Sequence, residues 1–186
     1  MIATRALQTE HALILKQLDN LSTARARLES GRWPPSELFA IAVAFARNFA
    51  DRFHHVKEEF VLFGVLARRE EGRLDLEIGA LRHQHECCRN AITEMDRALK
   101  GYEARDEIAT TALLTHLAAY TSLLRRHIHL EDTIFFPMAE AALTHEDQRS
   151  VTDYFHEEEL RLKGKDLLVK SRQQVNTLRE MLRRQL

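Results

Sequence analysis

The sequence predicts an all-α fold, an up-down-up-down four-helix bundle with an additional C-terminal helix. Only 6 Gly and 3 Pro occur in 186 residues, too few for the frequent turns of a β-protein. Apolar residues make up 45% of the chain and charged residues 30%, which allows both a core and a polar surface. The apolar residues recur at helical spacing within long segments that short turn signals separate.

The first two helices are predicted over residues 3–28 and 36–69. Gly31 ends the first, because glycine readily adopts the left-handed conformation that closes a helix. The following Trp33-Pro34-Pro35-Ser36 segment forms the turn, and Glu70-Glu71-Gly72 breaks the second helix. These two helices should therefore form an antiparallel hairpin.

The third and fourth helices are predicted over residues 74–99 and 106–137. Lys100-Gly101 should close the third helix, and Pro137 should kink or end the fourth. A short helical continuation over residues 138–143 follows. The second hairpin thus repeats the arrangement of the first.

A last helix is predicted from residue 146 to the C-terminus. Thr144 and Asp147 resemble a capping box at its start, with Asp in the usual Glu or Gln role. We therefore expect the bundle over residues 1–144 and a charged helical extension over residues 145–186, packed on the bundle or projecting from it.

Two stretches of the chain, His54–Phe63 and His127–Phe136, nearly repeat each other. Each has a His followed four residues later by a Glu, then a second acid and an apolar stretch ending in Phe. Residues four apart lie on one helix face, so each stretch offers an imidazole and a carboxylate to one point. Taken alone, either pair is more simply a solvated ion pair on a helix surface.

Four histidines, one from each bundle helix, are predicted to lie at one height. Two residues of an antiparallel hairpin are level when the turn lies midway between them. The predicted turns lie midway between His11 and His54, between His54 and His85, and between His85 and His127. In addition, 74 residues separate His11 from His85 and 73 separate His54 from His127, so the second hairpin is a copy of the first.

This joint pattern favours a metal site over separate ion pairs. Mixed imidazole and carboxylate ligands suit iron, manganese or zinc. Two carboxylates with four imidazoles are too many for one four-coordinate zinc, so they suit two metal ions bridged by the carboxylates. The predicted ligands are His11, His54, Glu58, His85, His127 and Glu131.

The motifs that carry these residues resemble those of hemerythrin-like, or HHE cation-binding, domains. They are Glu-His-x-x-Ile at Glu10–Ile14, the His54–Phe63 stretch, x-His-Glu at Gln84–Glu86 and His-Ile-x-x-Glu-Asp-x-x-x-Phe-Pro at His127–Pro137. The resemblance covers about residues 3–143. It implies a four-helix bundle with a non-haem di-iron centre held by the same six ligands.

The chain departs from the oxygen-carrying hemerythrins on its third helix. Those proteins use five histidines, with a His-x-x-x-His pair on that helix, whereas Arg89 stands four residues after His85 here. One nitrogen ligand of the carriers' pattern is therefore missing. The sequence leaves open which residue completes the site, and the candidates are His55, His83, His156 and Glu159.

The resemblance implies a protein that binds or senses dioxygen, peroxide or nitric oxide, or registers iron or redox state. A di-iron enzyme of peroxide removal or of nitrosative and iron stress repair is one alternative, so the sequence leaves enzymatic activity open. A metal-free helical interaction scaffold is the other. The charged segment Lys163–Leu186 is a candidate surface for a homodimer or a protein partner.

Composition excludes several other roles. The formal net charge is -1 and no nucleic-acid-binding motif occurs, so no nucleic-acid partner is expected. No apolar run approaches the roughly 20 residues that a membrane span needs, and residues 1–10 lack the apolar region of a secretory signal. Adjacent helical cysteines such as Cys87 and Cys88 seldom form a disulfide. We therefore expect a reduced, cytoplasmic protein.

Overall fold

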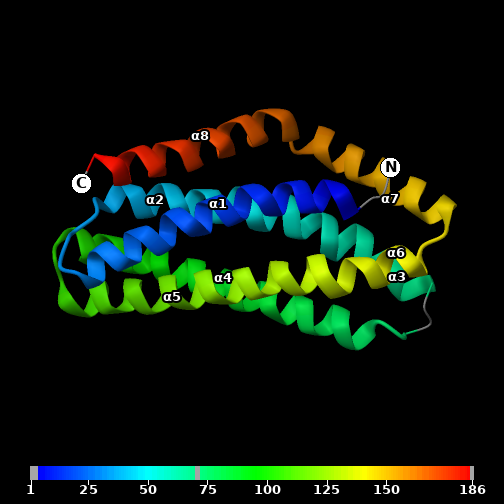
Figure 1. Cartoon of the computed structure of the whole chain (residues 1–186), viewed down its shortest axis with the longest axis horizontal. Coiled ribbons are helices and arrows are strands. Elements are labelled where there is room, and N and C mark those ends of the chain that lie inside the picture. The colour runs from blue at the N-terminus through cyan, green and yellow to red at the C-terminus, as the bar shows by residue number, and fades with distance from the viewer. Residues whose placement is uncertain (1–3, 70–71, 185–186) are drawn as a thin grey trace.

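The computed structural model describes residues 4–69 and 72–184, and this part of the chain consists of helices joined by short turns, without strands (Figure 1). The all-α bundle is thus confirmed. Its helices follow the predicted order: α1 (Thr4–Glu29), then α2 (Ser36–Phe45) continued by η1 (Ala46–His55), η2 (Lys57–Leu62) and α3 (Phe63–Arg69), then α4 (Asp75–Glu103), and α5 (Glu107–Leu130) continued by η3 (Glu131–Phe135) and α6 (Phe136–Ala142).

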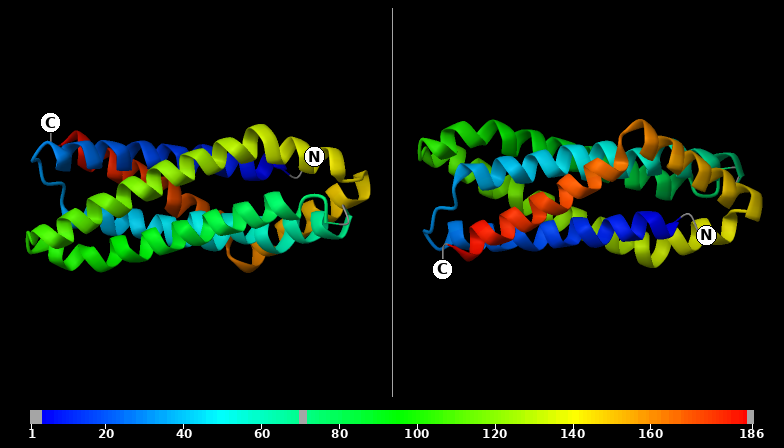
Figure 2. Two further views of the ribbon diagram at one scale, coloured as in Figure 1. Left: turned by 90° about the horizontal axis from the view of Figure 1, so that it is seen from below. Right: turned by 90° about the horizontal axis from the view of Figure 1, so that it is seen from above.

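The bundle helices run antiparallel to their neighbours along one long axis (Figure 2). Their apolar stripes form two clusters of buried side chains, one containing Phe39, Phe49 and Leu117, and the other containing Phe63 and Phe136. Each helix crosses from one cluster to the other through its predicted ligand residues. The polar centre is therefore a layer between two apolar cores.

Three segments next to this layer, η1, η2 and η3, are π-helical. A π-helix closes hydrogen bonds from i to i+5, and such turns are rare outside functional sites. The sequence predicts plain helix here. The adjacent residues His54 and His55 are both buried in this π-helical region. On a regular α-helix two adjacent side chains point about 100° apart.

One predicted helix end in the second hairpin is wrong, because helix α4 continues past Gly101 to Glu103. Gly101 lies where α4 and α5 approach closely, and a Cβ at this position would collide with the Cβ of Ala109. Pro137 lies in the first turn of α6, where proline is tolerated, and the predicted helical continuation after it runs to Ala142. The predicted break at Glu70-Glu71 lies outside the described residues.

The predicted last helix is two helices, α7 (His145–Arg161) and α8 (Gly164–Arg183). They meet at Lys163, whose backbone is left-handed with φ 51°, and Gly164 packs so closely that a Cβ would lie 3.0 Å from Phe53 Cε2. The capping box of Thr144 and Asp147 is confirmed. Figure 1 shows α7 and α8 as an arch along the bundle.

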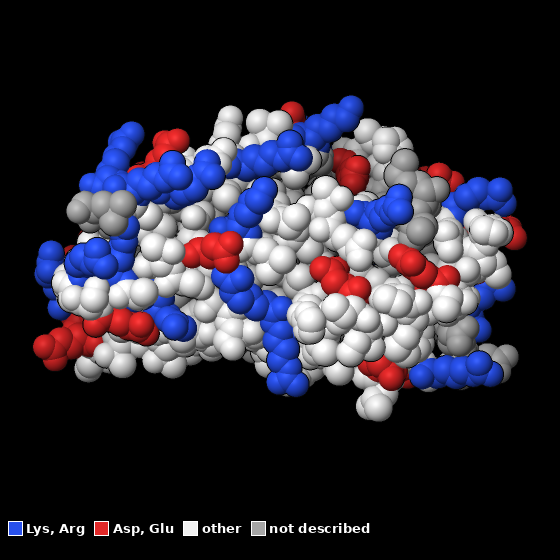
Figure 3. Space-filling model, viewed as in Figure 1, with Lys and Arg blue, Asp and Glu red and all other residues white. Residues whose placement is uncertain are grey.

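Helix α8 packs on α1 and α2, and Asn20 Nδ2 of α1 donates a hydrogen bond to the Val175 carbonyl oxygen at 2.9 Å. Its outer side is rich in lysine and arginine, which form the blue band along the upper edge of Figure 3. The role of this surface in a homodimer or with a partner, and the division at residue 145, remain predictions. Within residues 4–69 and 72–184, no helix combines the length and apolar character needed to cross a membrane.

Candidate metal centre

Seven buried side chains meet in the polar layer, and they form two overlapping groups. One group contains His55, Glu58, His85 and His127, and the other contains His11, His54, Glu58 and Glu131. Within each group the potential ligand atoms lie within 4.8 Å of one another, and every one of the seven residues is at most 1% exposed. All six residues predicted from the sequence are present, and His55 joins them.

Every bundle helix contributes to this centre. His11 comes from α1, His85 from α4 and His127 from the last turn of α5, while the π-helical segments η1, η2 and η3 supply the rest. The predicted common height of the four histidines is thus realised. Of the other candidates for the missing ligand, His83 contacts Cys87, His156 is exposed and Glu159 lies near Lys57, so none of them enters the centre.

The two carboxylates lie between the histidines. Glu58 Oε1 is 3.4 Å from His54 Nε2 and 3.9 Å from His11 Nε2, and Glu58 Oε2 is 3.5 Å from His85 Nε2. Glu131 Oε2 is 3.3 Å from His11 Nε2 and 3.0 Å from His127 Nε2. Each carboxylate therefore reaches a histidine of both groups, as a bridging ligand must.

Four of the imidazoles are oriented by a hydrogen bond on their outer nitrogen. His85 Nδ1 lies 2.6 Å from Glu59 Oε1, and His127 Nδ1 lies 2.9 Å from Gln84 Oε1. In the other group, Glu10 Oε2 holds His54 Nδ1 at 2.9 Å and Asp132 Oδ1 holds His11 Nδ1 at 2.8 Å. Because these partners are acceptors, each Nδ1 carries the proton when the ring is neutral, and Nε2 presents a lone pair to the centre.

The inward-facing atoms lack ordinary hydrogen-bond partners. Among the described residues, neither oxygen of Glu58 or Glu131, neither ring nitrogen of His55, and neither Nε2 of His11 nor of His54 has one. The Nε2 atoms of His85 and His127 lie 3.0 Å apart, and the acceptors on both Nδ1 atoms favour the tautomer with the lone pair on Nε2. Two lone pairs this close repel each other unless a proton or a metal ion is bound beside them, so the donor set fits a bound metal ion.

Electrostatics within the centre also favour a cation. Burial raises the pKa of Glu58 well above its usual range, and the neighbouring charge of Glu131 raises it further. Burial likewise lowers the pKa of His54 and His55 well below the ordinary value. For His11, burial lowers the pKa, but the hydrogen-bonded Asp132 and the nearby charge of Glu131 outweigh it and raise the pKa to about 9. Metal binding would displace the protons that the raised pKa values leave on Glu58 and His11.

Lys57 connects this centre to α7. Its ammonium group is fully buried, pairs with Glu10 and lies 4.0 Å from the centre of the Phe53 ring. It also lies 3.5 Å from Glu159 Oε1. The Glu10 carboxylate is thus shared between Lys57 and His54, which fixes the orientation of the His54 ring.

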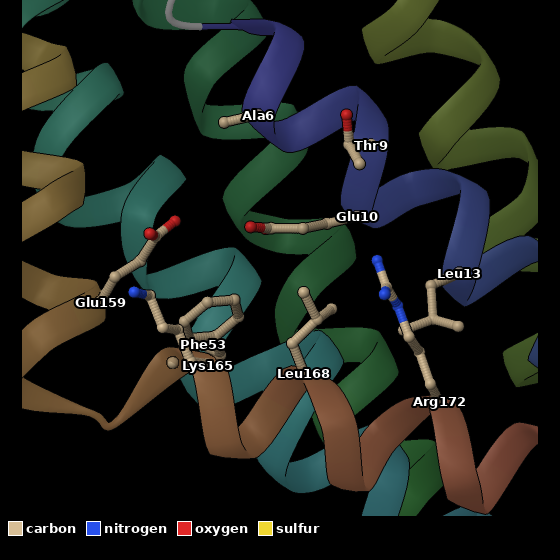
Figure 4. Close-up of a pocket in the computed structure, with 10 residues that line it drawn as sticks. Ala6, Thr9, Glu10, Leu13, Phe53, Glu159, Lys165, Leu168 and Arg172 are labelled. Carbon is tan, nitrogen blue, oxygen red and sulfur yellow. The ribbon is translucent and has the colours of Figure 1, made fainter.

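A cavity of about 260 Å³ lies on the outer side of Glu10, between α1 and α8. Figure 4 shows Glu10 projecting from α1 across the pocket toward Glu159 of α7, with Leu168 of α8 below it. Its lining is mainly apolar, and Glu10 has both oxygens engaged by Lys57 and His54. This cavity adjoins Glu10, which holds the outer edge of His54, but none of the predicted metal ligands lines it.

The residues that orient the imidazoles were not predicted from the sequence. The sequence does contain a signal for these residues, because each of them is adjacent in sequence to a predicted ligand. They are Glu10, Gln84, Glu59 and Asp132. On a helix, neighbours in sequence point to different sides, so each of these side chains can reach only the outer edge of a ligand on another helix. The sequence alone does not identify the ligand that each of these side chains contacts.

Comparison with known proteins identifies a family for most of the chain. The family model described as Hemerythrin HHE cation binding domain matches residues 3–139. The uncharacterized proteins Mb2018 of Mycobacterium bovis and Rv1995 of Mycobacterium tuberculosis are each 26% identical over 162 residues, 87% of this chain and 63% of their own length. The chain therefore spans less than two thirds of these relatives. No solved structure matches.

Proposed function

The chain belongs to the hemerythrin HHE cation-binding family, and from this membership and the geometry of the centre we propose that it binds two non-haem iron ions and a small ligand, namely dioxygen, nitric oxide or peroxide. One ion would be held by His55, His85 and His127, and the other by His11 and His54, with Glu58 and Glu131 between them. His55 supplies the fifth nitrogen in this assignment.

The observation that carries the proposal is the convergence of five imidazoles and two carboxylates in a fully buried layer, where the oxygens of Glu58 and Glu131 have no hydrogen-bond partner among the described residues. A metal-free scaffold would leave these buried polar atoms uncompensated. Five imidazoles and two carboxylates suit iron, and they also suit manganese or zinc. Bound iron would supply redox chemistry and coordination positions open to a small ligand.

The protein's part in this function is to orient the ligands and to exclude bulk water. The ligand rings are packed between aromatic side chains, since Phe136 stacks on His11 at 5.6 Å and Phe63 on His85 at 6.3 Å between ring centres. Such an enclosure admits small ligands and disfavours large substrates. Binding or sensing is therefore the function that the geometry supports best.

The test is metal analysis of protein purified without chelators and reconstituted anaerobically with ferrous iron. We expect about two iron ions per chain, and a near-ultraviolet charge-transfer band when oxygen or nitric oxide is admitted. His127→Ala should lose metal, whereas His129→Ala, an exposed histidine on the same helix, should retain it. Absence of metal after reconstitution would contradict the proposal, and catalytic turnover of added peroxide would favour the enzymatic alternative.

A further inference from the structure

Arg89 makes an unusual set of contacts at the edge of the centre. It lies on α4 one turn after His85, and its side chain is 28% exposed. Its Nε donates to Asp51 Oδ1 at 2.7 Å, its Nη2 to Glu59 Oε1 at 2.5 Å and its Nη1 to Glu86 Oε1 at 2.6 Å. One guanidinium therefore engages carboxylates from three helical segments.

Two of these carboxylates continue inward to ligand imidazoles. The same Glu59 Oε1 that accepts from Arg89 also accepts from His85 Nδ1 at 2.6 Å. Asp51 Oδ1 lies 3.5 Å from His55 Nδ1. The rings of His55 and His85 are stacked, with centres 3.8 Å apart and planes inclined by 12°. Arg89 thus lies behind two adjacent, parallel ligands.

The geometry of guanidinium suits this position. Its donors form a rigid planar fork that can hold two carboxylates at once, whereas an ammonium group acts as a point charge. Glu59 is 14% exposed, and without Arg89 its carboxylate would be free to turn toward solvent instead of toward His85. The second group of ligands does not depend on Arg89, because His54 is oriented through Glu10 and Lys57.

We propose that Arg89 is a positioning residue for the half of the centre formed by His55, Glu58, His85 and His127. It acts by holding Glu59 and Asp51 against the outer edges of His85 and His55. This inference rests on the proposed metal binding, but its structural part, the orientation of the two rings, applies to the metal-free protein as well.

The experiment compares the full-length wild-type chain with Arg89→Gln and Arg89→Lys. Ferrous iron is titrated anaerobically into metal-free protein in competition with a chelator. Loss of an outer hydrogen-bond partner of a ligand typically weakens metal binding by about 10- to 100-fold. Arg89→Gln loosens such a partner, Glu59, without removing it, so we expect a loss at the lower end, about 10-fold, for one of the two ions only. Arg89→Lys should restore part of the affinity, because lysine can hold one of the two carboxylates.

The matched control is Arg47→Gln. Arg47 Nη1 donates to Asp96 Oδ2 at 2.7 Å and joins the same two segments, η1 and α4, away from the ligands. It should leave both binding events unchanged. A second readout uses the imidazole nitrogen chemical shifts of the metal-free proteins, in which Arg89→Gln should move the signals of His55 and His85 but not those of His11 and His54.

Several results would overturn the proposal. If Arg89→Gln weakened the binding of both ions equally, or of neither, Arg89 would only form ion pairs between helices. The same would follow if Arg47→Gln lost as much metal affinity as Arg89→Gln. If Arg89→Gln does not fold, Asp51→Asn keeps the Arg89–Glu59 pair and should move the His55 signals alone; unchanged His55 signals would contradict the role of Asp51. If wild-type protein binds no iron, the proposed function fails, while the nitrogen shifts still decide whether Arg89 orients the two rings.

Discussion

Replacement of Glu58 by Gln should separate metal binding from folding. Glu58 is completely buried, reaches histidines of both ligand groups and has no hydrogen-bond partner on either oxygen among the described residues. Gln has nearly the same shape but no charge. In metal-free protein, Glu58→Gln removes a carboxyl whose ionised form is disfavoured by burial and by Glu131. The melting temperature of the metal-free variant should therefore equal or exceed that of wild type.

The effect in the presence of metal should have the opposite sign. A ligand at 100 times its dissociation constant stabilises the folded state by about 2.7 kcal/mol per site. For a chain of this length, 1 kcal/mol corresponds to roughly 2–4 °C, so each ion should raise the melting temperature by about 5–11 °C. A hundredfold loss of affinity would reduce the gain to about 0.4 kcal/mol per site, or roughly 1–2 °C.

The assay is calorimetric or fluorescence-monitored melting of both proteins, with and without zinc as a redox-inert probe and with ferrous iron under anaerobic conditions. Glu94→Gln, at a partly exposed ion pair with Arg97 on α4, is the control and should keep the full metal-dependent increase. A variant that melts well below wild type without metal, yet keeps the metal-dependent increase, would show that Glu58 is structural and would refute the reasoning.

Three further predictions concern the scaffold. Gly101→Ala should destabilise the protein by about 1–3 kcal/mol in denaturant unfolding, because the new methyl group overlaps Ala109 of the facing helix α5. Gly79→Ala is the contrast: its methyl group has open space, so it should stabilise the protein by up to about 1 kcal/mol. A Gly101→Ala variant as stable as wild type would contradict the close approach of α4 and α5. Thr144→Ala removes the capping box of α7 and should cost about 1 kcal/mol, seen as earlier hydrogen exchange in α7. Burial raises the pKa of the Cys88 thiol to about 12, so at neutral pH iodoacetamide should modify the half-buried Cys87 well before Cys88. Mass spectrometry would show the order of modification. Equal rates of modification would contradict the burial of Cys88.

The bundle and most of its centre could be predicted because both depend on helical periodicity. Apolar spacing defines the four bundle helices, and the turn midpoints place His11, His54, His85 and His127 at one level. This inference needs only the rise and repeat of a helix, which vary little between proteins. It succeeded for the residues on α-helices, His11, His85 and His127, and also for His54, Glu58 and Glu131 on the π-helical segments.

The sequence left His55 as one of four candidates, because adjacent residues lie about 100° apart on an α-helix and His54 already accounted for this helix. The segment that contains both histidines is π-helical, and both are buried. A π-turn is recognised by its hydrogen bonds and has no residue signature as clear as a capping box. Arg89 supplies no metal donor, as the sequence indicates, but its contacts with Asp51 and Glu59 could not be predicted because they arise only when the helices pack.

The break between α7 and α8 was missed for another reason. Lys163 adopts a left-handed backbone without being glycine, which costs roughly 1–2 kcal/mol. That cost is offset by packing, because the turn brings Gly164 against Phe53 and lets α8 follow the surface of α1 and α2. Such tertiary compensation is invisible in a single segment of sequence.

The complete burial of the seven donor residues has a consequence for how quickly a bound metal ion could leave. Because no donor is more than 1% exposed, such an ion would enter or escape only when part of the bundle opens. A chelator added to the loaded protein would then report the rate of that opening and not the strength of coordination. The time for which the protein retains the metal ion would thus measure how often the bundle opens. Core substitutions far from any ligand would shorten that retention time.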